Sequence, residues 1–451
     1  MSKNEHLFRS WKEIAAYLNC DIRTCLRWEK KLGLPVHRLE GGTRGSIFAY
    51  KEEIDRWISE RAGKYDKPGV PSDAGDARPR KKRFLFNPWL LIPIHLAVWA
   101  LIVVVVLAVT HKPMSRIPRD FKIDGSVLAV LNKDRRELWR ADTSIKNLKD
   151  DAAYKSRFQR KTRNSDQMPE YPWIGFTDIN RDGRLETIFV TKTLDEFQEG
   201  EILCYNDRGD KLWRFKAGRE QVIGGQPFSA DYRIGGFDTF DLGQDDRSEV
   251  ILFATHKPDF PCQLVVLSAD GRQLGEYWNP GHINDFNFAD LNGDGRAELI
   301  ICGVNNEYGR GFLAIFSAAR ISGTSPQVHE EFRFKDLKSG SENFYVLIPR
   351  TDADAGDYPV DACNSVSLLE NKEISVSSAR SGLYYEFSFG LEPLRVRTSH
   401  TFQVLHKKAV EANKVTSVLS PAYYEDLKKR ILFWDGGAKK WIRGRAMSNP
   451  W

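Results

Sequence analysis

The sequence predicts a multi-domain protein: a small α+β domain at the N-terminus, one transmembrane helix, and a large all-β domain of repeated units. Three observations lead to this fold class: helix-period apolar patterns near the N-terminus, one long uncharged apolar run, and acidic loops that recur between strand-like segments. A chain of 451 residues is long enough for two or three independent cores. We place the boundaries at residues 1–62 for the α+β domain, 63–83 for a flexible basic linker, 84–110 for the transmembrane helix and 111–451 for the all-β domain.

The N-terminal domain has start and stop signals for short helices and a hairpin. Ser10 followed by Glu13 is a capping-box pattern and predicts a helix start. A second helix is expected from Ile22 to Gly33, with basic residues on the side that its apolar positions leave exposed. Residues 34–50 predict two strands around a Gly-rich tip, a wing-like hairpin, and a closing helix follows it.

The second helix and the hairpin contain a run of motif positions: Thr24, Leu26, Arg27, Trp28, Glu29, Leu32, Gly33, Leu34, Pro35 and Arg38. At these residues the sequence resembles the winged helix-turn-helix family of the MerR and excisionase type, over about 60 residues. The resemblance implies double-stranded DNA as a partner, with base reading by the second helix and phosphate contacts by the wing. The long dimerising helix of MerR proteins is missing, so a minimal excisionase-like domain fits better.

Basic and hydroxyl side chains on these elements are the candidate DNA contacts. They are Arg23, Thr24, Arg27, Lys30, Lys31, Arg38, Thr43 and Arg44. Residues 1–83 have a net charge of roughly +7 against +6 for the whole chain, so the basic charge lies at this end. An ordinary solvated face around Arg27 and Glu29, or a protein-binding use of the same fold, is the alternative.

One segment predicts the topology. Residues 89–109 contain no charged side chain over a length that matches the hydrocarbon core of a bilayer. The alternative is a buried helix of a soluble domain. The basic run at residues 78–83 outweighs the charges on the other side, which places the N-terminus in the cytoplasm and the all-β domain outside the plasma (inner) membrane.

Three acidic loops precede apolar strands in the all-β domain. In the first and third loops, Asp, Asn, Asp, Gly and Glu stand at positions 1, 3, 5, 6 and 9, a spacing that brings oxygen atoms together as a calcium ion requires. The candidate calcium ligands are Asp178, Asn180, Asp182, Glu186, Asp290, Asn292, Asp294 and Glu298. The second loop departs from the pattern at Gly243 and Asp246. A plain Asp-Gly hairpin turn without metal is the alternative.

Apolar hairpins alternate with these loops, as in "CYNDRGDKLWRF" and "VLSADGRQLGEYW". The combination resembles the FG-GAP, integrin-α or VCBS type of β-propeller repeat, most clearly over residues 173–304. At 45 to 50 residues per blade, the resemblance implies about seven blades. We expect the terminal hairpin around Trp434 to close the ring with the strand near Val127.

Four cysteines of the all-β domain have two open interpretations, since Cys204, Cys262, Cys302 and Cys363 could form disulfides or be buried thiols. No catalytic residue stands out, so we expect no enzyme activity. The leading hypothesis is a membrane-anchored one-component transcription regulator, with cytoplasmic DNA binding coupled to an extracytoplasmic propeller that senses an unidentified ligand, and with homodimerisation as the simplest signal. The alternatives are a binding or adhesion propeller anchored by the N-terminal domain, and an extracytoplasmic propeller enzyme.

Overall fold

The structure is a computed structural model, and it describes nine segments of the chain. The described residues are 7–38, 47–62, 115–158, 168–195, 200–258, 260–318, 320–353, 360–378 and 382–444. The chain divides into two compact units, Met1–Val106 and Leu107–Trp451. We treat each unit separately and call them the N-terminal unit and the β unit.

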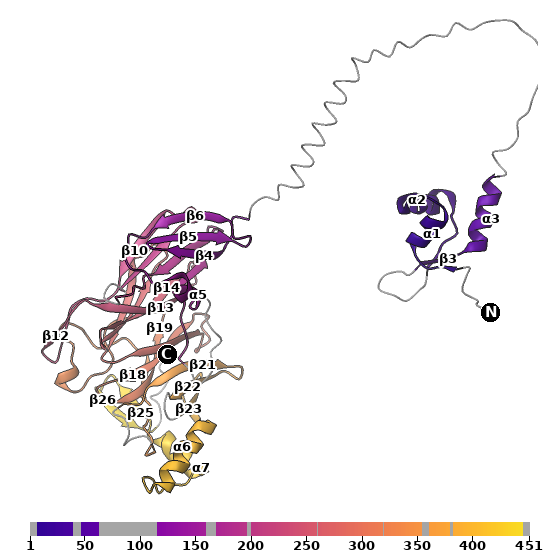
Figure 1. The fold of residues 1–451 in the computed structure, drawn as a ribbon. Helices are drawn as coiled ribbons and strands as arrows, with labels where there is room; N and C mark the ends of the chain where they lie inside the picture. The colour runs from indigo at the N-terminus through magenta and orange to yellow at the C-terminus, as the bar shows by residue number, and fades with distance from the viewer. Residues whose placement is uncertain are drawn as a thin grey trace, which may run out of the picture. The chain divides into compact units, whose positions relative to one another are not determined.

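Three helices and a three-stranded sheet form the N-terminal unit (Figure 1). The elements are β1 (Leu7–Phe8), α1 (Trp11–Tyr17), α2 (Ile22–Leu32), β2 (His37–Arg38), β3 (Ile47–Tyr50) and α3 (Lys51–Ala62), with sheet order β1-β3-β2. The side chain of Ser10 caps α1 and that of Asp21 caps α2. Gly33 ends α2 in the left-handed conformation, at φ 64°. The local signals in the sequence therefore place both helices correctly.

The classification of this unit as a winged helix-turn-helix is not supported and is corrected. Of the expected wing, the structure describes only strand β2 and its pairing with β3, where His37 lies opposite Phe48 and Arg38 opposite Ile47. The tip of the hairpin, residues 39–46, lies outside the described residues. Short helices joined by a turn and a hairpin stem are compatible with many small folds, which is why the pattern alone misassigned the class.

The single-pass membrane topology is likewise not supported. Within the described part of the chain, no helix is long and apolar enough to cross a membrane. The apolar segment on which the prediction depended, residues 84–110, lies outside the described residues, as does the linker 63–83. We therefore do not retain the transmembrane helix, the plasma-membrane localisation or the extracytoplasmic placement of the β unit.

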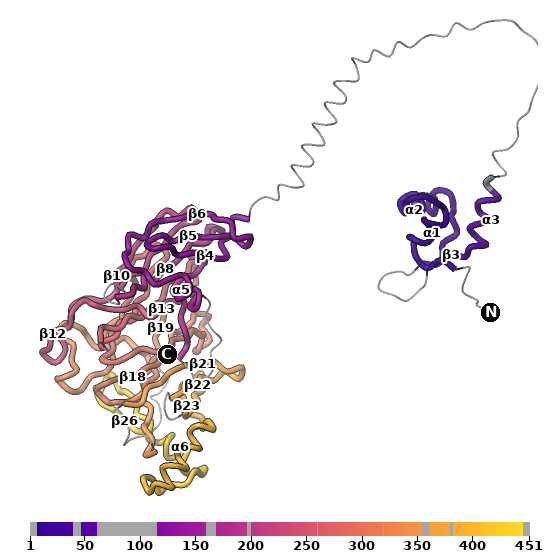
Figure 2. Tube along the Cα trace, viewed as in Figure 1, coloured from indigo at the N-terminus to yellow at the C-terminus, as the bar shows by residue number. Residues whose placement is uncertain are grey.

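The β unit consists of antiparallel sheets that follow the order of the chain, except that the last two strands join an earlier sheet (Figures 1 and 2). A three-stranded sheet contains β4 (Pro118–Asp124), β5 (Val127–Asn132) and β6 (Glu137–Asp142). Three four-stranded sheets contain β7 (Ile174–Thr177), β8 (Glu186–Val190), β9 (Glu201–Tyr205) and β10 (Lys211–Lys216); β13 (Tyr232–Phe240), β14 (Glu249–His256), β15 (Cys262–Leu267) and β16 (Gln273–Asn279); and β21 (Cys363–Leu369), β22 (Glu373–Ser378), β23 (Leu383–Ser388) and β24 (Pro393–Thr398). A six-stranded sheet contains β17 (Ile283–Ala289), β18 (Glu298–Asn305), β19 (Arg310–Ser317), β20 (Phe344–Leu347), β25 (Leu432–Asp435) and β26 (Lys440–Arg443).

Shorter elements connect these sheets. They are α5 (Asp151–Lys155), the hairpin of β11 (Gln221–Ile223) and β12 (Gln226–Phe228), the 3-10 helix η2 (Glu330–Phe332), α6 (His400–Glu411) and α7 (Pro421–Lys429). Each sheet packs on the next through an apolar layer, because side chains of neighbouring sheets share one buried cluster. Strands β4–β6 lie at one end of the stack and α6 and α7 at the other (Figure 1). The β unit is therefore an all-β, propeller-like stack of sheets.

The expected seven-bladed ring is wrong in two respects. The described residues of the β unit form five sheets of three or more strands, because the connection between β19 and β20 and the two helices within residues 400–429 do not form blades. The terminal hairpin does not pair near Val127. Instead β25 pairs with β20, with Leu432 opposite Leu347, so the C-terminus extends a sheet in the middle of the unit.

The cysteines of the β unit are buried thiols rather than disulfides. Cys204, Cys262, Cys302 and Cys363 are completely buried in the apolar layers, and no disulfide joins any of the six cysteines of the chain. Burial raises the pKa of the thiols of Cys204 and Cys262. These side chains therefore act as small apolar residues of the core.

Candidate functional site

The three acidic loops occupy the same place in three successive sheets. Each loop joins the first strand of a sheet to the second, from β7 to β8, from β13 to β14 and from β17 to β18. The last acid of each loop, Glu186, Glu249 or Glu298, is the first residue of the second strand and is buried. The repeat read from the sequence is therefore a structural repeat.

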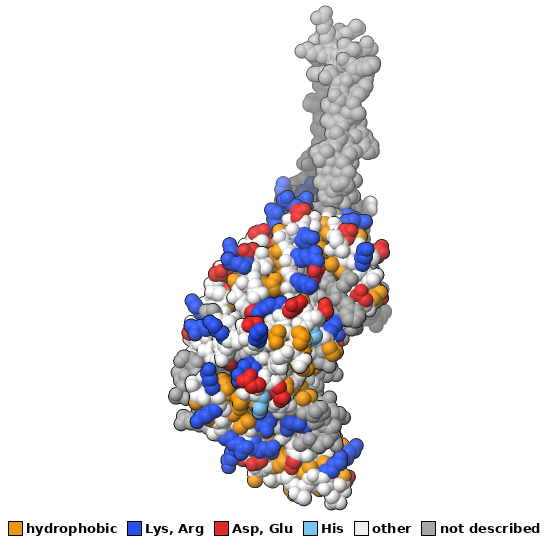
Figure 3. Space-filling view, turned by 90° about the vertical axis from the view of Figure 1, so that its left-hand side faces the viewer, with side chains coloured by type: hydrophobic (Ala, Val, Ile, Leu, Met, Phe, Trp, Pro, Cys, Tyr) orange, Lys and Arg blue, Asp and Glu red, His pale blue; other side chains and the backbone are white. Residues whose placement is uncertain are grey.

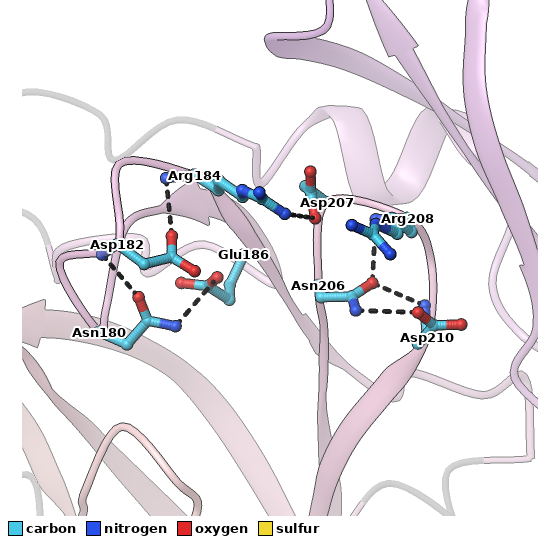
Figure 4. Close-up of polar contacts among 8 residues, drawn as sticks. All are labelled: Asn180, Asp182, Arg184, Glu186, Asn206, Asp207, Arg208 and Asp210. Atoms are coloured by element: carbon cyan, nitrogen blue, oxygen red, sulfur yellow. Dashed lines mark hydrogen bonds and ion pairs between the residues drawn. The ribbon is translucent and has the colours of Figure 1, made fainter.

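In the first loop, side-chain oxygen atoms accept hydrogen bonds from the loop's own main chain (Figure 4). Asp178 accepts the N–H groups of Asp182 at 3.1 Å and Gly183 at 2.9 Å. Asn180 accepts the N–H of Asp182 at 2.9 Å, and its amide nitrogen donates to Glu186 at 3.4 Å. The four predicted ligand residues are thus brought together in one tight turn.

The third loop repeats this hydrogen bonding. Asp290 accepts the N–H groups of Gly293 at 2.7 Å and Gly295 at 2.9 Å. Asn292 accepts the N–H of Asp294 at 2.8 Å, and its amide nitrogen donates to Glu298 at 3.2 Å. Two loops more than 100 residues apart therefore share one geometry.

The second loop keeps only part of the hydrogen bonding that the first and third loops share. Glu249 accepts the N–H of Leu242 at 2.8 Å, which corresponds to the bond from Leu291 to Glu298 in the third loop. Asp246 stands in the left-handed conformation at φ 66°, where the other two loops have a glycine. Its carboxylate pairs with Arg181 of the first loop at 3.1 Å. Metal ligation in this loop is not expected.

The first loop is also held to a neighbouring hairpin. Arg184 pairs with Asp207, with 3.6 Å between the guanidinium nitrogen and the carboxylate oxygen (Figure 4). Asp207 belongs to the turn between β9 and β10, where Asn206 accepts the N–H groups of Arg208 and Asp210, both at 2.9 Å. The acidic loop thus has fixed contacts at its border as well as inside it.

Burial disfavours the charged form of the last acid in every loop. It raises the pKa of Glu186 to about 7, and the carboxylates of Asp182 and Asp178 raise it further. The pKa values of Glu249 and Glu298 are raised for the same two reasons. A bound proton or a bound cation would relieve this penalty.

The donor set suits a hard cation, since it consists only of carboxylate and amide oxygen atoms. However, no group of three His, Cys, Asp or Glu side chains in the described part of the chain is arranged to hold a metal ion. The main-chain N–H groups occupy several of the oxygen atoms that a cation would use. Calcium binding at these loops remains a prediction.

A cavity of about 480 Å³ lies between the second and third acidic loops. Its polar lining includes Glu249, Glu298, Asp294 and Arg296, and its apolar lining includes Leu274. Sequence reasoning missed the cavity, because half of its wall comes from β15, β16, β19 and the connection after β19. Only the packing of adjacent sheets brings these segments together.

In the N-terminal unit, half of the eight predicted DNA contacts are exposed side chains of helix α2. Arg23, Arg27, Lys30 and Lys31 of α2 are exposed. Two other candidates have internal partners: Thr24 donates to Asp21 at 2.9 Å, and Arg38 pairs with Glu29 at 2.8 Å. Thr43 and Arg44 lie outside the described residues. His37 pairs with Glu53 at 2.7 Å, which is a structural contact.

Charged side chains are more evenly mixed on the β unit. On the face that Figure 3 shows, Lys and Arg side chains are spread over the surface with acidic side chains between them. This face has no extended region of a single charge. The exposed basic cluster on α2 therefore has no counterpart there.

No protein-family model matches the chain, and no curated protein matches it. Among solved structures, a protein of unknown function from Bacteroides caccae is 10% identical, with 62% of this chain and 73% of that chain covered and a TM-score of 0.26. The Dos1 propeller is 7% identical, with 61% and 65% covered and a TM-score of 0.29. The V. cholerae biofilm matrix protein Bap1 is 12% identical, with 64% and 57% covered and a TM-score of 0.23. At these scores the similarities carry no argument about function.

Neither the MerR or excisionase resemblance nor the FG-GAP resemblance is supported by a family model. The description as a transcription regulator is therefore not retained.

Proposed function

We propose that the β unit is a binding module that takes calcium at the acidic loops of residues 178–186 and 290–298. The observation that carries this proposal is the repetition of one hydrogen-bonded acidic turn at the same position of two sheets, with a cavity beside the second copy. Alternating oxygen ligands around a glycine at the sixth position are what a calcium loop requires. Modules of this kind bind calcium at roughly 0.1 to 1 mM.

Calorimetric titration of the full chain with calcium chloride tests this proposal. We expect heat from binding in that concentration range, and a loss of one site in the double variant Asp290→Asn, Asp294→Asn. The matched control is Asp241→Asn, Asp245→Asn in the degenerate loop, which should leave the titration unchanged. The absence of any calcium heat at 5 mM, or an equal loss in both variants, would reject the proposal.

A catalytic role is not part of the proposal. The nearest approach to a hydrolytic arrangement is Ser229, whose hydroxyl lies 3.2 Å from Nε2 of His256. That hydroxyl donates to Asp231 at 2.8 Å, so the carboxylate does not orient the histidine. Nδ1 of His256 is buried without a hydrogen-bond partner among the described residues, and burial lowers the pKa of the imidazole. The pair lacks the orienting group that nucleophile activation needs.

We further propose that the N-terminal unit contacts double-stranded DNA through α2. The supporting observation is the set of exposed cations at Arg23, Arg27, Lys30 and Lys31 on a helix whose N-terminal end is open to solvent. Basic side chains on a short helix can neutralise phosphates and reach base edges in the major groove. Dimerisation would raise affinity by joining two half-sites.

Gel-shift titration of the full chain at several salt concentrations tests this second proposal. Affinity should fall steeply with salt, because phosphate neutralisation releases counterions. The variant Arg23→Ala, Arg27→Ala should weaken binding about tenfold or more and reduce the salt slope by about two. Arg56→Ala removes an exposed charge from α3 of the same unit and is the control. Affinity that ignores salt, or an equal loss in the control, would reject DNA contact by α2.

A further inference from the structure

A second cavity in the β unit lies where two distant segments meet. Its volume is about 460 Å³. One wall is the connection between β19 and β20, residues 318–343, and the other is the terminal hairpin of β25 and β26, which contributes Trp434 and Lys439. The hairpin reaches this place because β25 pairs with β20. Neither the acidic loops nor α2 contributes to it.

Two polar atoms at this cavity are buried and unused. Oε1 of Gln327 accepts the N–H of Phe334 at 3.3 Å, which fixes the amide, while its Nε2 has no hydrogen-bond partner among the described residues. Oε2 of Glu342 is also buried without a hydrogen bond of ordinary geometry, although the Tyr277 hydroxyl lies near enough to lower the pKa of this carboxyl. Buried hydrogen-bond donors and acceptors are rarely left unpaired in folded proteins. An unpaired donor and an unpaired acceptor in one cavity therefore indicate a ligand that has both an acceptor and a donor to offer.

The backbone makes room for the Glu342 carboxyl. A Cβ atom at Gly340 would lie 1.9 Å from Oε2 of Glu342 and 2.7 Å from Cε2 of Tyr277. Only glycine at this position lets the carboxyl occupy its place between the chain and the tyrosine ring. Burial raises the pKa of the Glu342 carboxyl to about 8, so at neutral pH the group is protonated and offers one O–H donor as well as acceptor oxygen atoms.

The rest of the lining is aromatic and cationic. Trp434 is half-buried at the cavity and can offer a flat apolar surface. Lys335 and Lys439 are exposed, line the same cavity, and have no ion-pair partner among the described residues. Arg333 also lines it, but its guanidinium is already paired with Glu330. Two uncommitted positive charges thus stand beside an aromatic ring.

We propose that this cavity binds an acidic saccharide, an oligosaccharide that contains a uronic acid. A sugar ring carries hydroxyl groups that donate and accept within a short distance, as Gln327 and Glu342 together require. Its apolar face suits Trp434, and its carboxylate suits Lys335 and Lys439. The volume is within the range of small-ligand sites. A phosphorylated ligand fits less well, because Arg333, the arginine of the lining, is already paired with Glu330.

This inference rests on the proposed role of the β unit as a binding module, and calorimetry of the full chain with digalacturonate tests it. Digalactose, which lacks the carboxylates, is the comparison ligand. We expect digalacturonate to bind at least about tenfold more tightly than digalactose. Failure to bind either sugar at 10 mM, or equal affinity for both, overturns the proposal. Calcium titration of the same samples is independent, so a missing saccharide site can be distinguished from a failed binding module.

Matched variants locate the site. Lys335→Ala with Lys439→Ala should weaken digalacturonate about tenfold and change digalactose less than twofold. Lys338→Ala with Lys440→Ala removes two exposed lysines next to them in sequence and outside the lining, and should change neither. Trp434→Leu should weaken both sugars about tenfold, and Glu342→Gln, which keeps the shape, should weaken both about threefold. Retained melting temperatures exclude misfolding, and equal effects of the two lysine pairs would overturn the assignment.

Discussion

The complete acidic loop at residues 290–298 and the degenerate loop at 241–249 show which part of the repeat is structural. Both loops keep the bond from a main-chain N–H to the last acid, at 2.8 Å in each. Only the complete loop has the Asp–Asn–Asp–Gly pattern and the extra bonds made by Asp290 and Asn292. The carboxylates at positions 1, 5 and 9 are present in both loops, and the degenerate loop lacks only the asparagine at position 3 and the glycine at position 6. The bond to the last acid therefore forms without that asparagine and glycine, and their presence in the two complete loops favours a role beyond folding, such as cation binding.

Of the changes considered, removal of the last acid of the complete loop should lower the free energy of unfolding most. Glu298→Ala leaves the buried N–H of Leu291 and the side-chain amide of the exposed Asn292 without their acceptor. We expect a loss of about 2 to 3 kcal/mol in the free energy of unfolding, measured by urea denaturation of the full chain. Glu249→Ala should lose about 1 kcal/mol less, because one acceptor bond rather than two is removed. Equal losses of unfolding free energy in the two variants would show that the additional hydrogen bond to Glu298 does not stabilise the complete loop.

The second effect is a pH dependence centred on Glu186. The folded carboxyl keeps its proton up to about pH 7, whereas the unfolded one loses it near 4.5. The folded state therefore binds more protons between these values, and stability falls as pH rises from about 4.5 to 7. Glu186→Gln should reduce this fall by the share of Glu186, on the order of 2 kcal/mol, while the raised pKa values of Glu249, Glu298 and Glu342 account for the fall that is left.

Added calcium should change the pH dependence of stability that Glu186 causes. A bound cation favours the ionised carboxylate, so saturating calcium should flatten the pH dependence of the wild type more than that of Glu186→Gln. Melting temperatures between pH 4.5 and 8, with calcium or with a chelator, provide the comparison. A pH dependence that persists unchanged in calcium would show that no cation reaches Glu186.

The sequence predicted the features that depend on local signals. Ser10 begins the first helix of the N-terminal unit and Gly33 ends the second, as their side chain and backbone require. The acidic turns were also found, since every contact inside them spans fewer than ten residues. Local pattern and local structure agree in these places.

Features that depend on distant contacts could not be predicted in the same way. The pairing of β25 with β20 joins strands about 85 residues apart in sequence, and nothing in either strand specifies the other. The blade count failed because it divided the length of the domain by the length of one blade, whereas the helices within residues 400–429 and the connection between β19 and β20 belong to no blade. Both cavities share this origin, because their walls come from segments that only the packing of sheets brings together.

The smallest expected effect concerns the backbone of the degenerate loop. Asp246 has φ 66°, a conformation that glycine adopts without strain and that Gly183 has in the first loop. Asp246→Gly should relieve this strain by about 1 kcal/mol, while the lost surface pair with Arg181 opposes it by about 0.5 kcal/mol. We expect a net gain of about 0.5 kcal/mol in urea denaturation. Arg181→Ala measures the contribution of the ion pair alone. If Asp246→Gly destabilises the chain by as much as Arg181→Ala does, then the ion pair, and not the backbone conformation, determines which residue the degenerate loop tolerates.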